Sequence, residues 1–273
     1  MSNFSITRIF EPITCCVSHR ELILTLIRRD ISSRYSGSFM GILWVVLTPL
    51  LMITIYTFVF SIVFEAKWGQ GVGSKTSFAL VLFSGLMLFN FFSECISRAP
   101  SLIIENSNYV KKIVFPLEVL PIVLLGTGFF HFVISFFVWL VAELLILGRL
   151  PPTALFFPLV ILPLCILIVG LSWIIASLGV FLRDINHFIS IALTIIMFLS
   201  PIFYPITALP KEYRPLLWLS PLMPVIEQTR AVLIAGVMPD IAMLTIYYAA
   251  AIVVMEIGFL WFKKTKNGFA DVL

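Results

Sequence analysis

The chain has 273 residues, of which 60% are hydrophobic and only 12% are charged. That is about half of the roughly 25% charged residues of an ordinary soluble domain, so a soluble chain could not hide this much apolar surface. The formal charge of +4 comes from Lys and Arg residues scattered between apolar segments, which argues against a continuous nucleic-acid-binding patch.

The first 39 residues contain one amphipathic stretch, between residues 19 and 35. Its aliphatic residues fall on one helical face: Leu22, Ile23, Leu26, Ile27 and Ile31. We therefore expect residues 1–39 to form a cytoplasmic amino terminus with an amphipathic helix on the inner membrane surface. Gly37 and Gly41 would allow a sharp turn and close helix packing before the first span.

Six apolar runs follow, and each is about as long as a membrane span. A helix needs about 20 apolar residues to cross a hydrocarbon core of about 30 Å. The runs cover residues 40–64, 78–97, 117–147, 154–182, 188–204 and 241–262. The predicted fold is an all-α membrane protein whose six-helix transmembrane domain occupies residues 40–262.

The Lys and Arg residues predict how these spans are oriented. With a cytoplasmic amino terminus, twelve of the 18 basic residues lie on the inner side and six on the outer side, as the positive-inside tendency requires. An even number of spans returns the tail, residues 263–273, to the cytoplasm. We therefore expect both termini and the loop 98–116 to be cytoplasmic.

Residues 205–240 are too apolar for a plain loop and too short for two further spans. Pro215, Pro221 and Pro224 break the segment into short helical pieces. Such pieces are typical of a re-entrant hairpin whose backbone is buried against protein. We expect this hairpin on the outer side, between spans 5 and 6, with Glu227 and Arg230 paired three residues apart on one helical face.

Residues that carry chemistry are few. Residues 69–76 resemble a phosphate-binding loop, but Ser74 replaces the second glycine, no strand precedes it and the charge count puts it outside. The histidines at 19, 131 and 187 lie in different segments, and the four cysteines show no disulfide or metal-ligand spacing. His131 lies deep in a span, where an interhelical hydrogen bond is favoured over a substrate contact or a protonation site. No catalytic or metal-binding residue is predicted. If the protein does energised work, another chain must therefore hydrolyse the ATP.

Four stretches carry a resemblance to a known family. They are Arg-Asp-Ile at 29–31 through Pro-Leu at 49–50, Glu-Asn at 105–106 through Pro-Leu-Glu at 116–118, Arg-Asp-Ile at 183–185, and Ser-Pro-Ile-Phe-Tyr-Pro at 200–205 through Pro221. In this order they resemble the permease subunits of ABC-2 type exporters for polysaccharides, such as O-antigen, capsule and teichoic acid. One departure is Ser220, where the family more often has Asn.

The resemblance implies a homodimer around a central path, with two ATPase subunits beneath it that bind ATP and Mg. A lipid-linked polysaccharide, with O-antigen as the first candidate, would cross the bacterial inner membrane. The cytoplasmic loops would dock on the ATPase through these residues: Glu105, Asn106, Lys111, Lys112, Arg183 and Asp184. The hairpin with Glu227 and Arg230 would form the outer gate.

Two further residue sets are expected to contact the substrate. Arg28, Arg29 and Arg34 would meet anionic lipid headgroups or a pyrophosphate linker, because guanidinium groups donate in pairs; simple anchoring to the membrane surface is the alternative. Aromatic rings stack on sugars, and the expected path residues are Trp44, Tyr56, Phe89, Phe91, Phe92 and Tyr204.

Other functions stay open at this point. An exporter for a drug or a small lipid would have the same organisation. A secondary transporter should show paired broken helices in two repeated halves, but only one hairpin is evident. A membrane enzyme acting on lipid or sugar should carry an acidic pair or a His-carboxylate motif in a loop, and none appears.

Overall fold

The computed structural model describes residues 11–59, 75–110, 115–182 and 184–273. Within these ranges every regular element is helical. Four helical segments are long and apolar enough to cross a membrane: Phe78–Glu105, Leu117–Leu147, Pro152–Phe181 and Ile241–Val272. Two shorter apolar helices, Leu43–Val59 and Ile185–Leu199, accompany them. The predicted all-α membrane fold is thus confirmed, with four of the six expected runs reaching this length.

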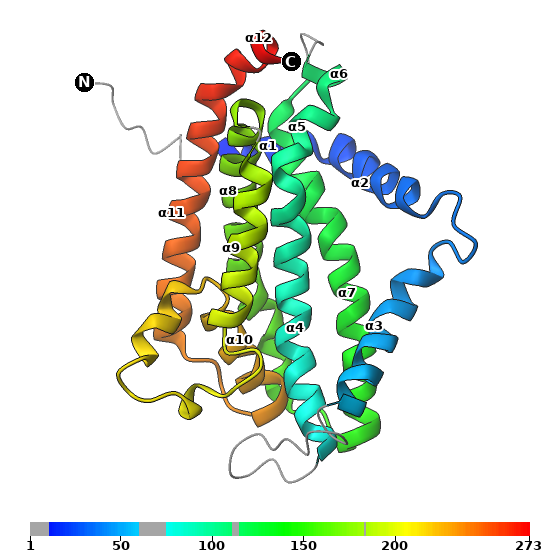
Figure 1. Cartoon of the computed structure of the whole chain (residues 1–273), viewed down its shortest axis with the longest axis vertical. Coiled ribbons are helices and arrows are strands. Elements are labelled where there is room, and N and C mark those ends of the chain that lie inside the picture. The colour runs from blue at the N-terminus through cyan, green and yellow to red at the C-terminus, as the bar shows by residue number, and fades with distance from the viewer. Residues whose placement is uncertain (1–10, 60–74, 111–114, 183) are drawn as a thin grey trace.

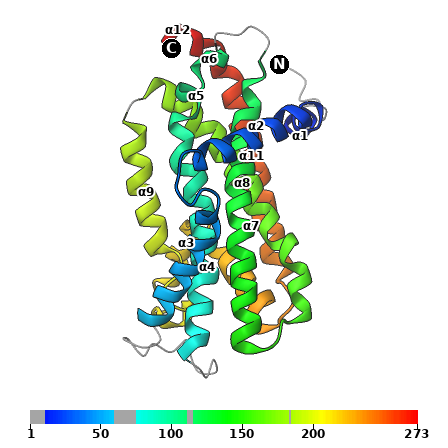
Figure 2. The same ribbon diagram turned by 90° about the vertical axis from the view of Figure 1, so that its right-hand side faces the viewer.

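The apolar helices form an elongated bundle (Figures 1 and 2). Its members are α3 (Leu43–Tyr56), α4 (Lys75–Arg98), α7 (Leu120–Leu147), α8 (Phe157–Phe181), α9 (Ile185–Leu199) and α11 (Ile241–Thr265). Helices suit such apolar sequences because all their backbone polar groups are paired within the segment. The order of the helices along the chain is the predicted one.

Helix α4 is the centre of this bundle. It contacts α3, α7, α8, α9 and α10 (Met223–Arg230). Every residue from 78 to 92 is buried except Asn90. Since α4 is enclosed by protein along most of its length, its apolar side chains form the core rather than a lipid-facing surface.

Helices α8 and α11 make the most extensive helix–helix contact in the described structure. Two glycines allow it: a Cβ at Gly170 would lie 2.6 Å from the Cα of Met255, and one at Gly258 would overlap the carbonyl oxygen of Gly170. At a third point, a Cβ at Gly179 would overlap the carbonyl oxygen of Pro100. Small residues of this kind let two helix backbones approach closely.

The two ends of the bundle differ. One end, called the terminal end here, carries α1 (Glu11–Ser18), α5 (Leu102–Glu105), α6 (Ser107–Val110) and α12 (Phe269–Val272) (Figure 1). Lys263 of α11 joins Glu11 of α1 at 2.7 Å, and Lys266, just after α11, joins Glu118, just before α7, so ion pairs connect segments from both ends of the chain there. The opposite end carries the segment 205–240, folded into 3-10 helices Ile206–Ala208 and Arg214–Leu219, α10, and a π-helical turn Ala231–Ala235.

The amphipathic stretch forms α2 (Arg20–Tyr35), which crosses the terminal end obliquely (Figure 1). Part of its aliphatic face packs on protein, because Ile23 and Leu26 cluster with Val119 and Val123. The turn after α2 is confirmed by positive φ at Gly37 (83°) and Gly41 (52°). The predicted close helix packing at these glycines is wrong, since a Cβ at either would meet nothing within 4 Å.

We predict that Gly258→Val destabilises the protein, because the added carbons would push α11 away from the α8 backbone. Overpacking of this kind costs about 1–3 kcal/mol. A lower unfolding temperature and a smaller monodisperse fraction in size-exclusion chromatography would report it. Gly268→Ala is the matched control, because its Cβ would sit 3.6 Å from Phe181, an ordinary contact. Equal behaviour of the two variants would contradict the packing assignment.

Candidate functional site

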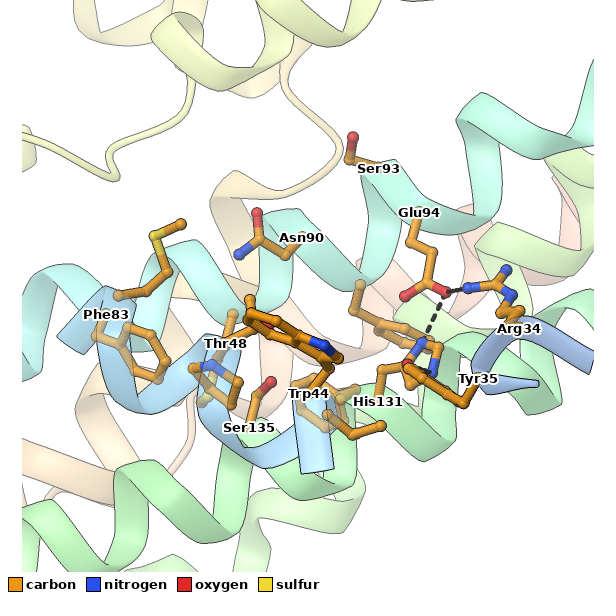
Figure 3. A pocket seen from close by; sticks show the side chains of 16 residues that line it. Arg34, Tyr35, Trp44, Thr48, Phe83, Asn90, Ser93, Glu94, His131 and Ser135 are labelled. Carbon is orange, nitrogen blue, oxygen red and sulfur yellow. Dashed lines mark hydrogen bonds and ion pairs between the residues drawn. The ribbon is translucent and has the colours of Figure 1, made fainter. Parts of the chain in front are cut away.

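A cavity of about 490 Å³ opens between the end of α2 and the helices α3, α4 and α7 (Figure 3). Its volume lies in the range of about 300–1,000 Å³ that is usual for small-ligand sites. The side chains that line it fall into an apolar group, a polar group and a group joined by hydrogen bonds. The apolar group includes Trp44, Phe83, Met87, Phe91 and Phe132. The polar group is Thr48, Asn90, Ser93 and Ser135, and the third group is Arg34, Tyr35, Glu94 and His131.

A continuous chain of hydrogen bonds forms the α2 side of this cavity (Figure 3). Arg34 Nη1 donates to Glu94 Oε1 at 2.6 Å, and His131 Nδ1 lies 2.8 Å from the same oxygen. Because a carboxylate only accepts, Nδ1 donates this bond, and Nε2 of the same ring forms a hydrogen bond with the Tyr35 hydroxyl at 2.9 Å. The favoured prediction for His131, an interhelical hydrogen bond, is confirmed.

Helix α2 is held to the bundle by two more polar contacts next to this chain. Arg98 donates from both terminal nitrogens to the carboxylate of Asp30 at 3.1 to 3.2 Å. Arg29 donates to the Tyr109 hydroxyl at 2.5 Å, and Tyr109 stacks on Phe115 with ring centroids 4.2 Å apart. One helix therefore contacts both the cavity and the short helix α6.

Metal-ligand groups and reactive thiols can be sought among the described residues. No group of three or more His, Cys, Asp or Glu residues within the described ranges could hold a metal ion. The four cysteines are free thiols, as predicted. Burial, and next the carboxylate of Glu118, raise the pKa of Cys15 to about 11, so this thiol is neutral at pH 7 and a poor nucleophile.

The structure brings only some of the predicted path aromatics together. Trp44 and Phe91 line the cavity. Phe89 and Phe92 are buried in the core of the bundle, and Tyr56 packs against that core. Tyr204 lies elsewhere, with its hydroxyl donating to the carbonyl of Phe198 at 3.0 Å.

The three arginines of α2 have different surroundings. Arg34 belongs to the hydrogen-bond chain, and Arg29 is engaged by Tyr109. Arg28 is exposed and lines a second cavity of about 520 Å³, together with Ile31, Ser32, Tyr35, Ser36, Ile42 and Phe130. Of the three, Arg28 is the one whose side chain makes no hydrogen bond with another described residue, although hydroxyl groups and an apolar wall lie beside it.

The predicted ATPase-facing residues lie at the terminal end wherever the structure describes them. Glu105 is exposed and accepts from Ser101 Oγ at 2.6 Å, whereas Asn106 donates to the Leu102 carbonyl and so caps a helical turn. Asp184 is exposed at the start of α9. Lys111, Lys112 and Arg183 lie outside the described residues, as do positions 69–74 of the phosphate-loop-like segment.

Glu227 and Arg230 pair as predicted, at 3.4 Å. Arg230 is only 8% exposed, however, and its guanidinium also donates to the carbonyl oxygens of Pro201 (2.5 Å) and Ile202 (3.0 Å). A weaker contact of 3.4 Å reaches the Val81 carbonyl on α4. Arg230 therefore attaches α10 to α4 and to the segment after α9. The spacing of Glu227 and Arg230 in the sequence predicted their ion pair but not these carbonyl contacts.

Sequence reasoning missed Glu94 as the centre of the cavity network. Two signals were present: Glu94 and His131 each interrupt an apolar run, where polar groups are costly and need partners. Nothing in the sequence said that these two partners were each other, because 37 residues separate them.

We predict that Glu94→Ala loosens α2, because Arg34 and His131 lose their shared acceptor. Breaking a partly buried charged hydrogen-bond pair costs roughly 2–4 kcal/mol. The unfolding temperature and the protease resistance of the α2–α3 connection should both fall. Glu21→Ala on the exposed face of α2 is the control and should leave both unchanged. An equally stable Glu94→Ala protein would contradict the network.

Comparison of the sequence with known proteins shows which family the chain resembles. Residues 21–234 match the family described as ABC-2 type transporter. The O-antigen export system permease protein RfbA of Myxococcus xanthus is 28% identical over 256 residues, 93% of this chain and 95% of that protein. A Klebsiella pneumoniae protein with the same description is 26% identical over 255 residues, with the same coverage. The polysialic acid transport protein KpsM of Escherichia coli is 24% identical over 247 residues, 89% of this chain and 92% of its own.

The resemblance indicated by the four sequence stretches is thereby confirmed. The family match covers α2 through α10 and so includes the cavity, the hydrogen-bond chain and the short helices of the terminal end. Because it spans most of the sequence, the protein belongs to the ABC-2 type transporter family.

Proposed function

We propose that this chain is the membrane-spanning subunit of an ATP-driven exporter that moves a lipid-linked polysaccharide, an O-antigen, across the bacterial inner membrane. The observation that carries the proposal is the end-to-end similarity to relatives described as O-antigen export permeases, which match 93% of the chain. Membership of a transporter family leaves the enzyme and secondary-transporter alternatives without support. The chain's own work is non-covalent binding and movement.

The proposed topology has six spans and two cytoplasmic termini. Besides the four long helices, α3 would cross, since Leu43–Val59 has 17 residues, at the lower limit of about 17–25 for a span. The apolar helix α9, with 15 residues, would be the sixth span. The common end of α1 and α12 supports an even number of crossings (Figure 1). The domains would be a cytoplasmic segment 1–39, the membrane domain 40–262 and a cytoplasmic tail 263–273.

The segment 205–240 would be the re-entrant hairpin that forms the outer gate. In support, α10 is almost wholly buried against the bundle, which a backbone entering the hydrocarbon region requires. Arg230 would hold this hairpin to α4, so that movement of α4 reaches the gate. Glu227, on the less buried side of the pair, would face the path.

Two copies of the chain would surround a central path, with two ATPase subunits below that bind ATP and Mg. The loop 98–116 and the start of α9 would dock on these subunits. In support, Ile104 and Glu105 are exposed at the terminal end, although the rest of α5 is buried. Glu105, Asn106 and Asp184 would belong to this surface, together with Lys111, Lys112 and Arg183.

The lipid-linked end of the substrate would enter beside α2. Among the arginines there, Arg28 has the fitting surroundings: an exposed guanidinium next to Ser32 and Ser36 for a phosphate, and Ile42 and Phe130 for a hydrocarbon chain. Arg29 and Arg34 would act mainly by holding α2 in place, since each is engaged by protein groups.

We predict that Glu105→Arg prevents a nucleotide-binding ATPase from copurifying with the tagged chain in mild detergent, because a reversed charge enters the docking surface. The wild type should bring down the ATPase in near-equimolar amount. Glu212→Arg is the matched control, because Glu212 is also exposed but lies at the opposite end, and this variant should retain the partner. A chain that remains active alone would contradict the ATP-driven mechanism.

Deletion of the gene should remove the O-antigen from the cell surface and leave lipid-linked glycan inside the cell. Electrophoresis of surface lipopolysaccharide and extraction of lipid-linked precursors measure the two effects. Loss of a capsule instead would favour the polysialic-acid type of exporter, to which the chain is also similar. Unchanged surface glycans would point to a drug or small lipid as the cargo and would overturn the proposed substrate.

A further inference from the structure

The cavity between α3, α4 and α7 contains polar side chains that the protein itself does not satisfy. Thr48, Asn90 and Ser135 line it from the three helices, and their side chains make no hydrogen bond with any other described residue. An acyl chain filling this space would leave each of these polar groups without a hydrogen-bond partner. Burying polar groups in this way costs free energy, and hydrocarbon offers no hydrogen bond in return.

An aromatic ring lies beside these polar groups. Trp44 is 41% exposed, and Figure 3 shows its ring among Asn90, Thr48 and Ser135. Phe83 and Phe91 form an apolar wall of the cavity. Free amide and hydroxyl groups around an exposed indole ring match a sugar ring, which presents hydroxyls at its edge and C–H bonds on its face.

The charges of the cavity select between sugar classes. Among its lining residues the charged side chains, apart from the hydrogen-bonded His131, are Arg34 and Glu94, and they pair at 2.6 Å. Arg98 and Asp30, next to them, form a second pair. Because these acidic and basic side chains balance one another, they give the cavity no net positive charge with which to retain a phosphate or a carboxylate.

We propose that this cavity binds one uncharged sugar unit of the transported glycan, with Asn90, Thr48 and Ser135 as hydrogen-bonding groups and Trp44 as the stacking surface. The proposal rests on the function proposed above and separates two parts of the substrate. The sugar would bind between α3, α4 and α7, and the anionic lipid linker would stay outside, beside Arg28.

Photo-crosslinking in intact cells tests the site for any glycan whose sugar units carry vicinal diols. The photoreactive residue p-benzoylphenylalanine is introduced at position 44 in one strain and at position 261 in another. Trp261 is the matched control, because it is a tryptophan of nearly equal exposure (43%) on α11, outside the cavity. After illumination, the purified chain is treated with periodate and a fluorescent hydrazide, which label vicinal diols of attached sugar.

Label on the position-44 protein at several times the level of the position-261 protein is the expected result. Label on neither, or equal label on both, would overturn the proposed site. The deletion strain separates this failure from that of the function: if deletion abolishes surface glycan and position 44 still captures no sugar, the exporter assignment stands and the cavity assignment falls.

Paired substitutions on α3 and α4 provide a second readout. Thr48→Val keeps the side-chain shape but removes the cavity hydroxyl. Combined with Asn90→Leu, it should reduce surface glycan by about thirtyfold, from two lost hydrogen bonds of the usual strength. Thr54→Val on α3 is the control, because the Thr54 hydroxyl already bonds to the Leu50 carbonyl away from the cavity. Undiminished export by a normally folded double variant would contradict the proposal.

Discussion

The enclosure of α4 by its neighbours is the constraint on which the rest of the structure depends. A helix surrounded by protein must present apolar side chains wherever it is covered, and residues 78–92 are buried with the exception of Asn90. Where α3 and α7 leave α4 uncovered, it presents Asn90, Ser93 and Glu94, and this opening is the cavity. The location of the polar site is thus a consequence of how the central helix is packed.

Glu94 then determines where α2 lies. One carboxylate oxygen accepts from both Arg34 and His131, so it connects a helix that crosses the end of the bundle with one that runs through it. Asp30 and Arg98 repeat this connection one turn along. Because polar contacts of this type are directional, they hold α2 in one orientation more firmly than its apolar contacts with Val119 and Val123 would alone.

The same helix contacts the two regions to which we assign different roles. Through Arg29 and Tyr109, α2 reaches the short helix α6 of the terminal end, and through Arg34 and Tyr35 it forms one side of the cavity. A displacement of the proposed docking loop, residues 98–116, would therefore be transmitted to the cavity through α2, a single helix of 16 residues. At the opposite end Arg230 plays a comparable part, since it bonds to backbone carbonyls of two other segments.

The sequence by itself determined the helical membrane fold, the order of the apolar runs, the short helical pieces of 205–240 and the amphipathic character of α2, because these follow from local composition, periodicity and proline positions. The family was also recognisable from motifs that stay contiguous in the chain. Only the tertiary structure decided which side chains meet: that Phe92 belongs to the core while Trp44 faces a cavity, and that Arg230 is anchored by carbonyls 28 and 29 residues away. The sequence predicted close helix packing at Gly37 and Gly41, whereas the structure has it at Gly170 and Gly258. The physical reason is that an all-apolar helix has no periodic signal to mark its inner face, so the partners of each side chain are fixed by packing between distant segments.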